Sequence, residues 1–290
     1  RIKKNIILLS ADMDAFSLRV MEKDLPDQYL NVGVSEQNMI NIAAGLALTG
    51  KIVFCYSIAS FATMRCYEQI KVNLCSMNLP VIIVGAGAGF SFGYDGPTHH
   101  GHQDLASMRL LPEMGIIDLS SNDIAKNSVK YCINEKKPFY IRLDKGPFPD
   151  YKSTLTDFKK GYRILRPLSK VNLVTSGFLT NTVSEVSDKL KNNFGFDLGV
   201  VDLFCVKPID NKFYLDVIKN SEKIYSIEES CTVGGLGSIL SEIITNNRSN
   251  CKLFKIGAPN KQFIEYGSRE WFHKKYKLDL EGIISQIGNF

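Results

Sequence analysis

Short apolar runs rich in β-branched residues alternate with helix-like segments along almost the whole chain, and this alternation constrains the fold most strongly. In the first half, strand patterns fall near residues 5–10, 51–57, 80–86, 115–120 and 138–144, and helical patterns near 35–49, 60–77, 104–111 and 122–136. The alternation resumes with the strand patterns "VNLVTS", "LGVVDL", "KIYSIEE" and "KLFKIG", which are again separated by helical patterns. Such an alternation predicts parallel sheets that are covered by helices.

The segment before "VNLVTS" divides the chain, because it is polar and rich in turn-forming residues. We therefore predict an α/β protein with two doubly wound domains, residues 1–150 and 169–290. Residues 151–168 are predicted to form a linker that holds at most one edge strand. A chain of 290 residues is long enough for two domains that each bury a core.

Composition argues against several kinds of partner. The net charge is +5, but the lysines are scattered and form no basic stripe, so we expect no nucleic-acid partner. The seven cysteines form no C-x-x-C pair, which predicts reduced thiols in a cytoplasmic protein. No apolar stretch is long enough to span a bilayer, so we expect no membrane partner.

The stretch "GVSEQNMINIAAGLALTG" predicts a buried helix, because it is apolar almost all round. Ser35 is a plausible N-cap and Gly50 a plausible C-terminal stop. Glu36 then lies in the first turn of this helix, directly after a strand-like segment. It either interacts with the helix dipole or acts as a site carboxylate at a strand–helix junction, where open α/β sheets bind ligands.

Two glycine-rich stretches invite a phosphate-binding interpretation. In "VIIVGAGAGFSFGYDGPTHHGHQD" (81–104) the glycines do not open directly into a helix, since Gly96 and Pro97 follow, so a dinucleotide-binding turn is excluded. In "CTVGGLGSILSEII" the glycines precede a helix and could bind phosphate. A plain tight turn is the better interpretation there, because the Lys-Ser/Thr of a P-loop is missing.

Three of the four histidines, His99, His100 and His102, lie in the first of these stretches. No carboxylate or cysteine stands at a recognisable ligand spacing from them, so we predict no metal site in this chain. The remaining interpretation is a long functional loop that presents Asp95 and histidines to a substrate.

Several motifs, in the same order, resemble the transketolase family, specifically its pyrimidine-binding domain followed by its C-terminal domain. The similar segments are "SADM" (10–13), "GVSEQNM" (33–39), "SIASFATMRCYEQI" (57–70), "YDGPTHHGHQDLASMRLLPEM", "FYIRLDKG", "VVDLFCVKPID" and "IEESCTVGGLGS". The resemblance implies a first domain with a parallel sheet that binds the pyrimidine of thiamine diphosphate. It also implies a smaller C-terminal domain with a mixed sheet.

The resemblance assigns cofactor-binding and catalytic residues. It implies that Glu36 contacts the pyrimidine ring, where a carboxylate favours the tautomer that serves as the base, so Glu36 is a catalytic residue. Phe61 is expected to stack on the pyrimidine, with Ile58 and Met64 beside it. Asp12 completes the cofactor-binding set. The structural alternative for Phe61 is an aromatic residue of the core.

The resemblance also assigns substrate-binding residues. It implies that Asp95 and His99 hydrogen-bond the hydroxyls of a ketose donor, and that His99 takes part in proton movement as a catalytic residue. His100 either lines the acceptor side or hydrogen-bonds the loop, and we expect the loop role for His102. Arg142 either binds a substrate anion or pairs with a carboxylate at a domain seam.

The expected reaction is the transfer of a two-carbon ketol unit from a ketose or ketose phosphate to an aldose. No "GDG" occurs in the sequence, and the family uses this motif to hold Mg²⁺ and the diphosphate. The resemblance therefore implies an N-terminal partner subunit that carries the diphosphate and Mg²⁺ site, in an α₂β₂ heterotetramer of a split transketolase. Neither chain is expected to be active alone.

Departures from the family concern the substrate. Gly87 and Ala88 stand where relatives carry a phosphate-contacting histidine or arginine, and Ile58 and Met64 are not aromatic. These differences favour a larger or non-phosphorylated aldose, as in a specialised sugar pathway. The alternatives are a 2-oxoacid decarboxylase β-subunit, an acyloin-forming enzyme similar to deoxyxylulose-phosphate synthase, and a scaffold without catalytic activity.

Overall fold

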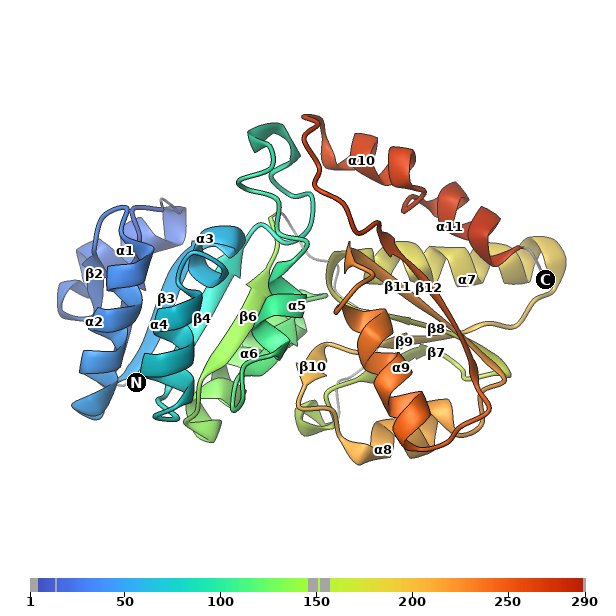
Figure 1. Cartoon of the computed structure of the whole chain (residues 1–290), viewed down its shortest axis with the longest axis horizontal. Coiled ribbons are helices and arrows are strands. Elements are labelled where there is room, and N and C mark those ends of the chain that lie inside the picture. Colours follow the sequence, from blue (N-terminus) through green and yellow to red (C-terminus); the bar gives the residue numbers. More distant parts are fainter. Residues whose placement is uncertain (1–4, 14, 146–150, 152–156, 289–290) are drawn as a thin grey trace.

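The computed structural model describes residues 5–13, 15–145, 151 and 157–288, and it shows two α/β halves side by side (Figure 1). The first sheet has seven strands in the order β10-β5-β6-β4-β3-β1-β2. These are β1 (Ile6–Ser10), β2 (Tyr29–Asn31), β3 (Ile52–Ile58), β4 (Val81–Ala86), β5 (Gly115–Asp118), β6 (Phe139–Leu143) and β10 (Cys205–Lys207). They run parallel except for β10, which is antiparallel to β5.

The second sheet is smaller and mixed, with five strands in the order β12-β11-β8-β9-β7. These are β7 (Arg163–Arg166), β8 (Val171–Thr175), β9 (Gly199–Asp202), β11 (Lys223–Cys231) and β12 (Lys252–Ala258). Only β7 pairs in an antiparallel way, with β9. The predicted fold class, two α/β domains with one parallel and one smaller mixed sheet, is confirmed.

The described helices differ widely in length, and the four of them that exceed ten residues were predicted from the sequence. In the first half they are α1 (Phe16–Asp24), α2 (Glu36–Leu48), α3 (Ala59–Thr63), α4 (Tyr67–Gln69), α5 (Asp104–Arg109) and α6 (Asn122–Glu135). In the second half they are α7 (Thr180–Phe194), α8 (Asn211–Phe213), α9 (Leu236–Asn246), α10 (Arg269–Tyr276) and α11 (Leu280–Ile287). No helix of the described residues combines the length and the apolar composition needed to cross a membrane.

Helix α2 packs on one face of the first sheet, as its apolar sequence predicts. Its Met39, Ile40 and Ala43 are fully buried and belong to the same core cluster as Val53 of β3 and Ile83 of β4. Burying such side chains stabilises the fold by roughly 1.5–3 kcal/mol for each large one. This packing fixes the first turn of α2, and with it Glu36, against the sheet.

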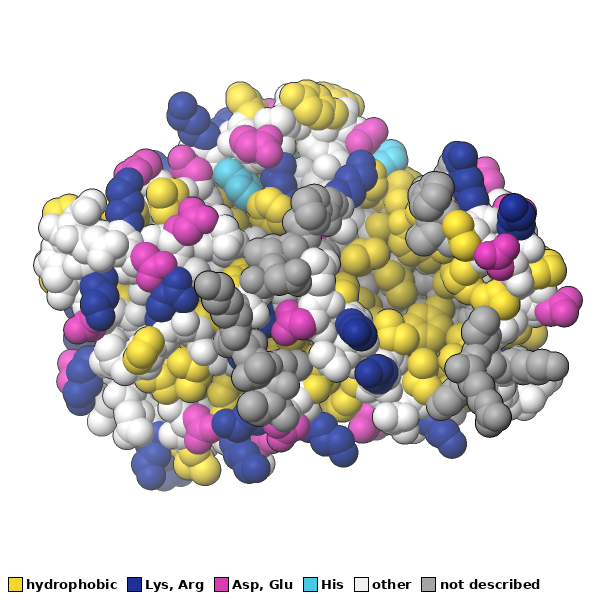
Figure 2. Space-filling view, turned by 180° about the vertical axis from the view of Figure 1, so that it is seen from behind, with side chains coloured by type: hydrophobic (Ala, Val, Ile, Leu, Met, Phe, Trp, Pro, Cys, Tyr) yellow, Lys and Arg dark blue, Asp and Glu magenta, His cyan; other side chains and the backbone are white. Residues whose placement is uncertain are grey.

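The opposite face of the first sheet is covered less completely. Along β3, Phe54, Tyr56 and Ile58 are half-buried, whereas Val53 and Cys55 are buried. Because successive strand residues point to opposite faces, this alternation marks a partly open apolar face. Figure 2, which shows the molecule from behind, has hydrophobic side chains gathered in a hollow over the half that holds this sheet.

Several elements were not predicted. Strand β10 comes from the C-terminal half but pairs with β5 of the first sheet. The elements α1, β2, α10 and α11 are short, with at most nine residues each. The predicted helix over 60–77 is α3, α4 and a π-helical turn over Ile70–Cys75. Strand β7 lies inside the predicted linker as its edge strand, and residues 152–156 of that linker lie outside the described part of the chain.

Candidate active site

The carboxyl ends of β1, β2, β3, β4 and β6 lie at one edge of the first sheet, because these strands are parallel. Open α/β sheets bind ligands at this edge. The segments that follow the strands carry Asp12, Glu36, Phe61 and the glycine-rich loop, here defined as residues 87–102. The topology therefore gathers most of the predicted site residues at one edge.

Glu36 begins α2 and is 3% exposed. Its Oε1 accepts a hydrogen bond from the Ser57 hydroxyl at 3.3 Å, and its Oε2 accepts one from Nη1 of Arg65 at 2.8 Å. Ser35 occupies the N-cap position, but its hydroxyl donates to the Val32 carbonyl and not to the helix. Glu36 is thus a buried carboxylate held by side chains of β3 and of the turn after α3, which goes beyond a simple interaction with the helix dipole.

Arg65 connects Glu36 to Phe61. While one nitrogen of its guanidinium pairs with Glu36, its central carbon lies 3.9 Å from the centroid of the Phe61 ring. A cation at this distance is attracted by the face of the ring. Arg65 was not named from the sequence, although its position four residues after Phe61 is the spacing at which helical side chains meet.

His99 lies on the other side of Phe61. The two rings meet edge to face with centroids 4.9 Å apart, and the Thr98 hydroxyl lies 2.9 Å from Nδ1 of His99. The Ser60 hydroxyl donates to the Thr98 carbonyl at 2.8 Å, which ties the loop to α3. The structure therefore brings Glu36, Phe61 and His99 together in one row.

The remaining predicted cofactor residues lie around this row or beside it. Ile58 ends β3 and is half-buried, and Met64 is 50% exposed at the end of α3, so both flank Phe61 along the chain. Asp12 is exposed after β1, where its Oδ1 accepts a hydrogen bond from Nδ2 of Asn31 at 3.0 Å. Asp12 thus stands at the same sheet edge, paired with the end of β2.

The glycine-rich loop is closed at its base by paired backbone hydrogen bonds between Gly89 and Gly101, at 2.8 and 2.9 Å. Gly89 has φ +57°, and a Cβ placed there would lie 2.3 Å from the Glu229 carboxyl. A side chain is excluded at this position by both conformation and space. The glycines therefore allow close backbone approach and form no dinucleotide-binding turn.

The other polar residues of the loop lie in two environments. Asp95 ends a 3₁₀ turn and is exposed, four residues before His99. His100 and His102 are 6% and 2% exposed and pack among aromatic rings, including Phe90. Among the described residues, the ring nitrogens of both histidines have no hydrogen-bond partner. The loop hydrogen bond expected of His102 is therefore wrong, and the structure does not bring His100 to the row of Glu36, Phe61 and His99.

Arg142 lies inside the protein, with 3% exposure. Its Nε donates to Asp104 at 2.8 Å, its Nη1 to Asp118 at 3.4 Å, and its Nη2 to the Gly101 carbonyl at 2.6 Å. Burial raises the pKa of the Asp118 carboxyl, and the Arg142 charge opposes that rise. This arrangement fits the second interpretation of Arg142, an arginine that pairs with carboxylates. The two aspartates compensate the Arg142 charge inside the fold.

The second glycine-rich stretch, before α9, binds a protein carboxylate. The backbone N–H groups of Leu236 and Gly237 donate to Glu228 at 2.7 and 2.8 Å, and a Cβ at Gly235 would lie 2.0 Å from the same carboxyl. Glu228 thus occupies the place that a phosphate would take, and the tight-turn interpretation is confirmed.

Glu228 should make stability depend on pH. Burial raises the pKa of its carboxyl to about 7, although both N–H donors lower it. The folded protein then holds a proton that the unfolded chain loses above its ordinary pKa of about 4.3. The free energy of unfolding should fall between these two values, by at most about 1.4 kcal/mol per pH unit from this group. Urea denaturation of the wild type and of Glu228→Gln across pH 5–8 measures this, and parallel pH profiles would contradict it.

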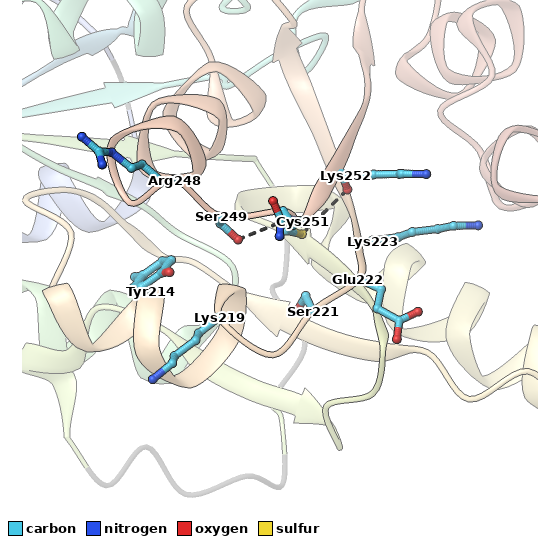
Figure 3. Close-up of a pocket in the computed structure, with 10 residues that line it drawn as sticks. Tyr214, Lys219, Ser221, Glu222, Lys223, Arg248, Ser249, Cys251 and Lys252 are labelled. Atoms are coloured by element: carbon cyan, nitrogen blue, oxygen red, sulfur yellow. Dashed lines mark hydrogen bonds between the residues drawn. The ribbon is translucent and has the colours of Figure 1, made fainter.

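A pocket of about 520 Å³ lies in the second half, at the amino ends of β11 and β12 (Figure 3). It contains the cations Lys219, Lys223, Arg248 and Lys252. In Figure 3, Lys223 and Lys252 point away from Lys219 and Arg248, so the charges do not converge. No group of three or more histidine, cysteine or acidic side chains is placed to hold a metal within the described ranges.

Comparison with known proteins identifies the family. Residues 2–149 match the model of the transketolase pyrimidine binding domain, and residues 161–283 match that of the transketolase C-terminal domain. An apulose-4-phosphate transketolase subunit from Actinobacillus succinogenes is 31% identical over 90% of this chain and 84% of that protein. The 1-deoxy-D-xylulose-5-phosphate synthase of Cytophaga hutchinsonii is 31% identical over 94% of this chain but over only 43% of the synthase.

A solved structure agrees with these matches. A split gene transketolase, described as an inactive beta4 tetramer, is 28% identical and superposes with a TM-score of 0.87, covering 98% of this chain and 91% of that chain. The match to the apulose-4-phosphate transketolase subunit and the superposition on the split transketolase chain both cover most of those proteins. The match to the synthase covers less than half of the synthase. This chain therefore belongs to the transketolase family and is a transketolase-type enzyme subunit with a pyrimidine-binding and a C-terminal domain.

Proposed function

We propose that this chain is the pyrimidine-binding subunit of a two-chain transketolase, which transfers a two-carbon ketol unit from a ketose or ketose phosphate to an aldose. The observation that carries the proposal is the row of Glu36, Phe61 and His99 at the carboxyl edge of the parallel sheet. There, Arg65 links the buried carboxylate to the half-buried aromatic ring, and the ring contacts the imidazole.

The residues present fit the pyrimidine end of thiamine diphosphate. When bound, this cofactor supplies the carbon nucleophile and, through its aminopyrimidine, the base that the reaction needs. Glu36 would contact the ring nitrogen, since a carboxylate has acceptor sites beyond those used by Ser57 and Arg65. Phe61 would stack on the ring, a contact worth about 1 kcal/mol beyond burial. Asp12, Ile58 and Met64 would complete the wall around it.

His99 and Asp95 would handle the sugar. We assign the catalytic proton transfer to Nε2 of His99, because the Thr98 hydroxyl already faces Nδ1. Asp95 is exposed on the same loop and would accept hydrogen bonds from substrate hydroxyls. His100 and Arg142, although predicted to bind substrate, would support the loop from inside, because they are buried behind it.

A partner chain would complete the enzyme. We propose an N-terminal transketolase subunit that holds Mg²⁺ and the diphosphate, in an α₂β₂ heterotetramer, because the sequence lacks the "GDG" motif. The apolar hollow in Figure 2 supports a partner, since exposed apolar patches mark interaction sites. The similar split transketolase forms an inactive tetramer of one kind of chain, so we expect this chain alone to be inactive. Its buried free cysteines favour the cytoplasm.

The acceptor should be a larger or non-phosphorylated aldose, because Gly87 and Ala88 offer no charge. Lys145 lies near the glycine-rich loop: its Nζ is 3.7 Å from the centroid of the Phe92 ring, and Phe92 lies beside His99. This lysine is the cation that a phosphorylated acceptor would meet. A panel of matched neutral and phosphorylated aldoses decides between these substrates.

The test of the function is a reconstituted assay with both chains, thiamine diphosphate, Mg²⁺, a ketose phosphate donor and the aldose panel. We expect turnover only when both chains are present. Pyruvate serves as the alternative donor, and turnover with pyruvate in place of the ketose would favour acyloin formation. Cofactor binding without any turnover would favour the scaffold.

Arg65→Met should weaken cofactor binding. The change removes the ion pair to Glu36 and the cation over Phe61, so neither side chain stays fixed for the pyrimidine. We expect the Kd for thiamine diphosphate to rise about 10-fold, which corresponds to about 1.4 kcal/mol. Fluorescence titration of the two-chain enzyme measures this, and Arg65→Lys, which keeps the charge, should recover part of the affinity. An unchanged Kd in Arg65→Met would remove Arg65 from the site.

A further inference from the structure

The C-terminal domain contacts the glycine-rich loop through the end of β11 and through residues 259–276, which we call the brace. The brace runs from the end of β12 through α10, and Figure 1 shows α10 at the same end of the molecule as the loop. The glycine-rich loop carries Asp95 and His99. The brace is therefore placed to affect these residues without being part of the site.

The tip of the loop touches the brace with no space between them. The Gly267 N–H donates to the Gly93 carbonyl at 3.3 Å. A Cβ at Gly93 would lie 2.4 Å from the Gly267 carbonyl oxygen, and one at Gly96 would lie 2.5 Å from the Tyr266 ring. Since both distances are far below van der Waals contact, the loop and the brace approach too closely for a side chain at Gly93 or Gly96.

The base of the loop is held by aromatic packing. Phe263 of the brace lies 4.6 Å from His102 and 5.0 Å from Phe90 between ring centroids, and Phe272 stacks on Phe90 at 4.5 Å and meets His100 at 5.3 Å. Among the described residues, neither histidine ring has a hydrogen-bond partner. Ring packing against the brace therefore holds the side chains of His100 and His102, and His99 directly precedes His100 in the chain. The backbone at His102 is also held by β11, because the His102 carbonyl accepts a hydrogen bond from the Cys231 N–H at 2.8 Å.

Arg269 anchors the brace to both sheets. Its Nη1 donates to Asp144, after β6, at 2.8 Å, and its Nε donates to Glu229 of β11 at 2.7 Å. Glu229 also accepts a hydrogen bond from the Phe90 N–H at 3.3 Å and lies 2.7 Å from Nε2 of His273. Arg269 is 9% exposed, so this network is buried and links the first sheet, the second sheet and the loop base.

We propose that the brace is a positioning element for the active-site loop, and that Phe263 and Arg269 are positioning residues for His99. The C-terminal domain then contributes to turnover by fixing the loop, although it touches no reacting atom. This inference rests on the proposed function for its kinetic consequence only. A displacement of about 1 Å at a reacting group can lower a rate about 100-fold.

Phe263→Leu tests the proposal, with Phe213→Leu as the matched control. Both phenylalanines are fully buried in the C-terminal half, but Phe213 packs on Tyr162 and not on the loop. In the two-chain enzyme, we expect Phe263→Leu to lower kcat at least about 10-fold while the Kd for thiamine diphosphate stays unchanged. Phe213→Leu should leave kcat unchanged. Equal kcat losses in both variants, or a loss of cofactor affinity instead of kcat, would overturn the proposal.

Hydrogen exchange gives a readout that does not depend on activity. The N–H groups of Gly89 and Gly101 close the loop, so their exchange should accelerate in Phe263→Leu and stay unchanged in Phe213→Leu. If Phe263→Leu fails to fold, Arg269→Lys keeps the charge but loses the paired donors, and the same acceleration is expected. Unchanged loop exchange would refute the brace even if the enzyme transfers ketol units. Faster loop exchange in a protein without ketol transfer would refute only the proposed function.

Discussion

Glu36→Gln should lower kcat for ketol transfer at least about 100-fold, the scale on which a positioned acid–base group contributes. Glutamine keeps the shape of the side chain but lacks the charge that would favour the reactive tautomer of a bound pyrimidine. The change should cost little stability, because its partner Arg65 is 43% exposed and stays solvated when the pair is lost. Steady-state kinetics of the two-chain enzyme, beside a thermal melt of the variant, measure both quantities.

Glu68→Gln is the control for this experiment. Glu68 also stands in the first turn of a helix, α4, in the same domain, but it is exposed. It should retain full activity. If Glu36→Gln keeps more than a tenth of the wild-type kcat, Glu36 is not the catalytic carboxylate and the proposed mechanism is wrong.

Arg142→Met should destabilise the protein by about 3–5 kcal/mol, the range found when one partner of a buried ion pair is removed. Methionine fills most of the volume, but Asp104 and Asp118 are 1% and 2% exposed and lose their cation. The Gly101 carbonyl at the base of the glycine-rich loop also loses its donor. Urea denaturation of the chain measures the change in the free energy of unfolding.

Arg166→Met is the control, because it removes an arginine from a surface ion pair instead of a buried one. Arg166 pairs with Asp188 at the surface, where their side chains are 36% and 48% exposed, and removing such a pair costs about 0–1 kcal/mol. A substrate anchor would behave differently from a structural arginine. If Arg142→Met raised KM for anionic sugars and left the free energy of unfolding unchanged, Arg142 would bind substrate after all.

Most elements that were predicted from sequence have strong periodic signals. The helix predicted over 35–49 agrees with α2 to within two residues at each end. Apolar residues fill most of its 13 positions, and a polar start and Gly50 mark its ends. Strand β10 was not predicted, because its three residues gain their order from pairing with β5. The segments of α10 and α11 gain theirs from packing and side-chain caps at Ser268 and Asp279.

The candidate site was predictable in part. Glu36, Phe61 and His99 were named from motifs, and the structure places them together because parallel strands deliver them to one edge. Arg65 was missed, because its importance comes from two contacts that only the folded chain makes. His100 and Arg142 were assigned to substrate, and burial places both inside the fold.

The sequence by itself determined the fold class and the family, because strand and helix periodicity and ordered motifs are local properties of the chain. Only the tertiary structure decided which polar residues remain free to act. A carboxylate or an arginine can bind a ligand or can pair with another side chain inside the protein. Burial and long-range contacts decide between these roles, as when Arg142 pairs with Asp104 and Asp118, which are 38 and 24 positions away in the sequence. The contact between the C-terminal domain and the glycine-rich loop could likewise be found only in the folded chain, because it joins residues that are distant in sequence, such as Phe263 and Phe90.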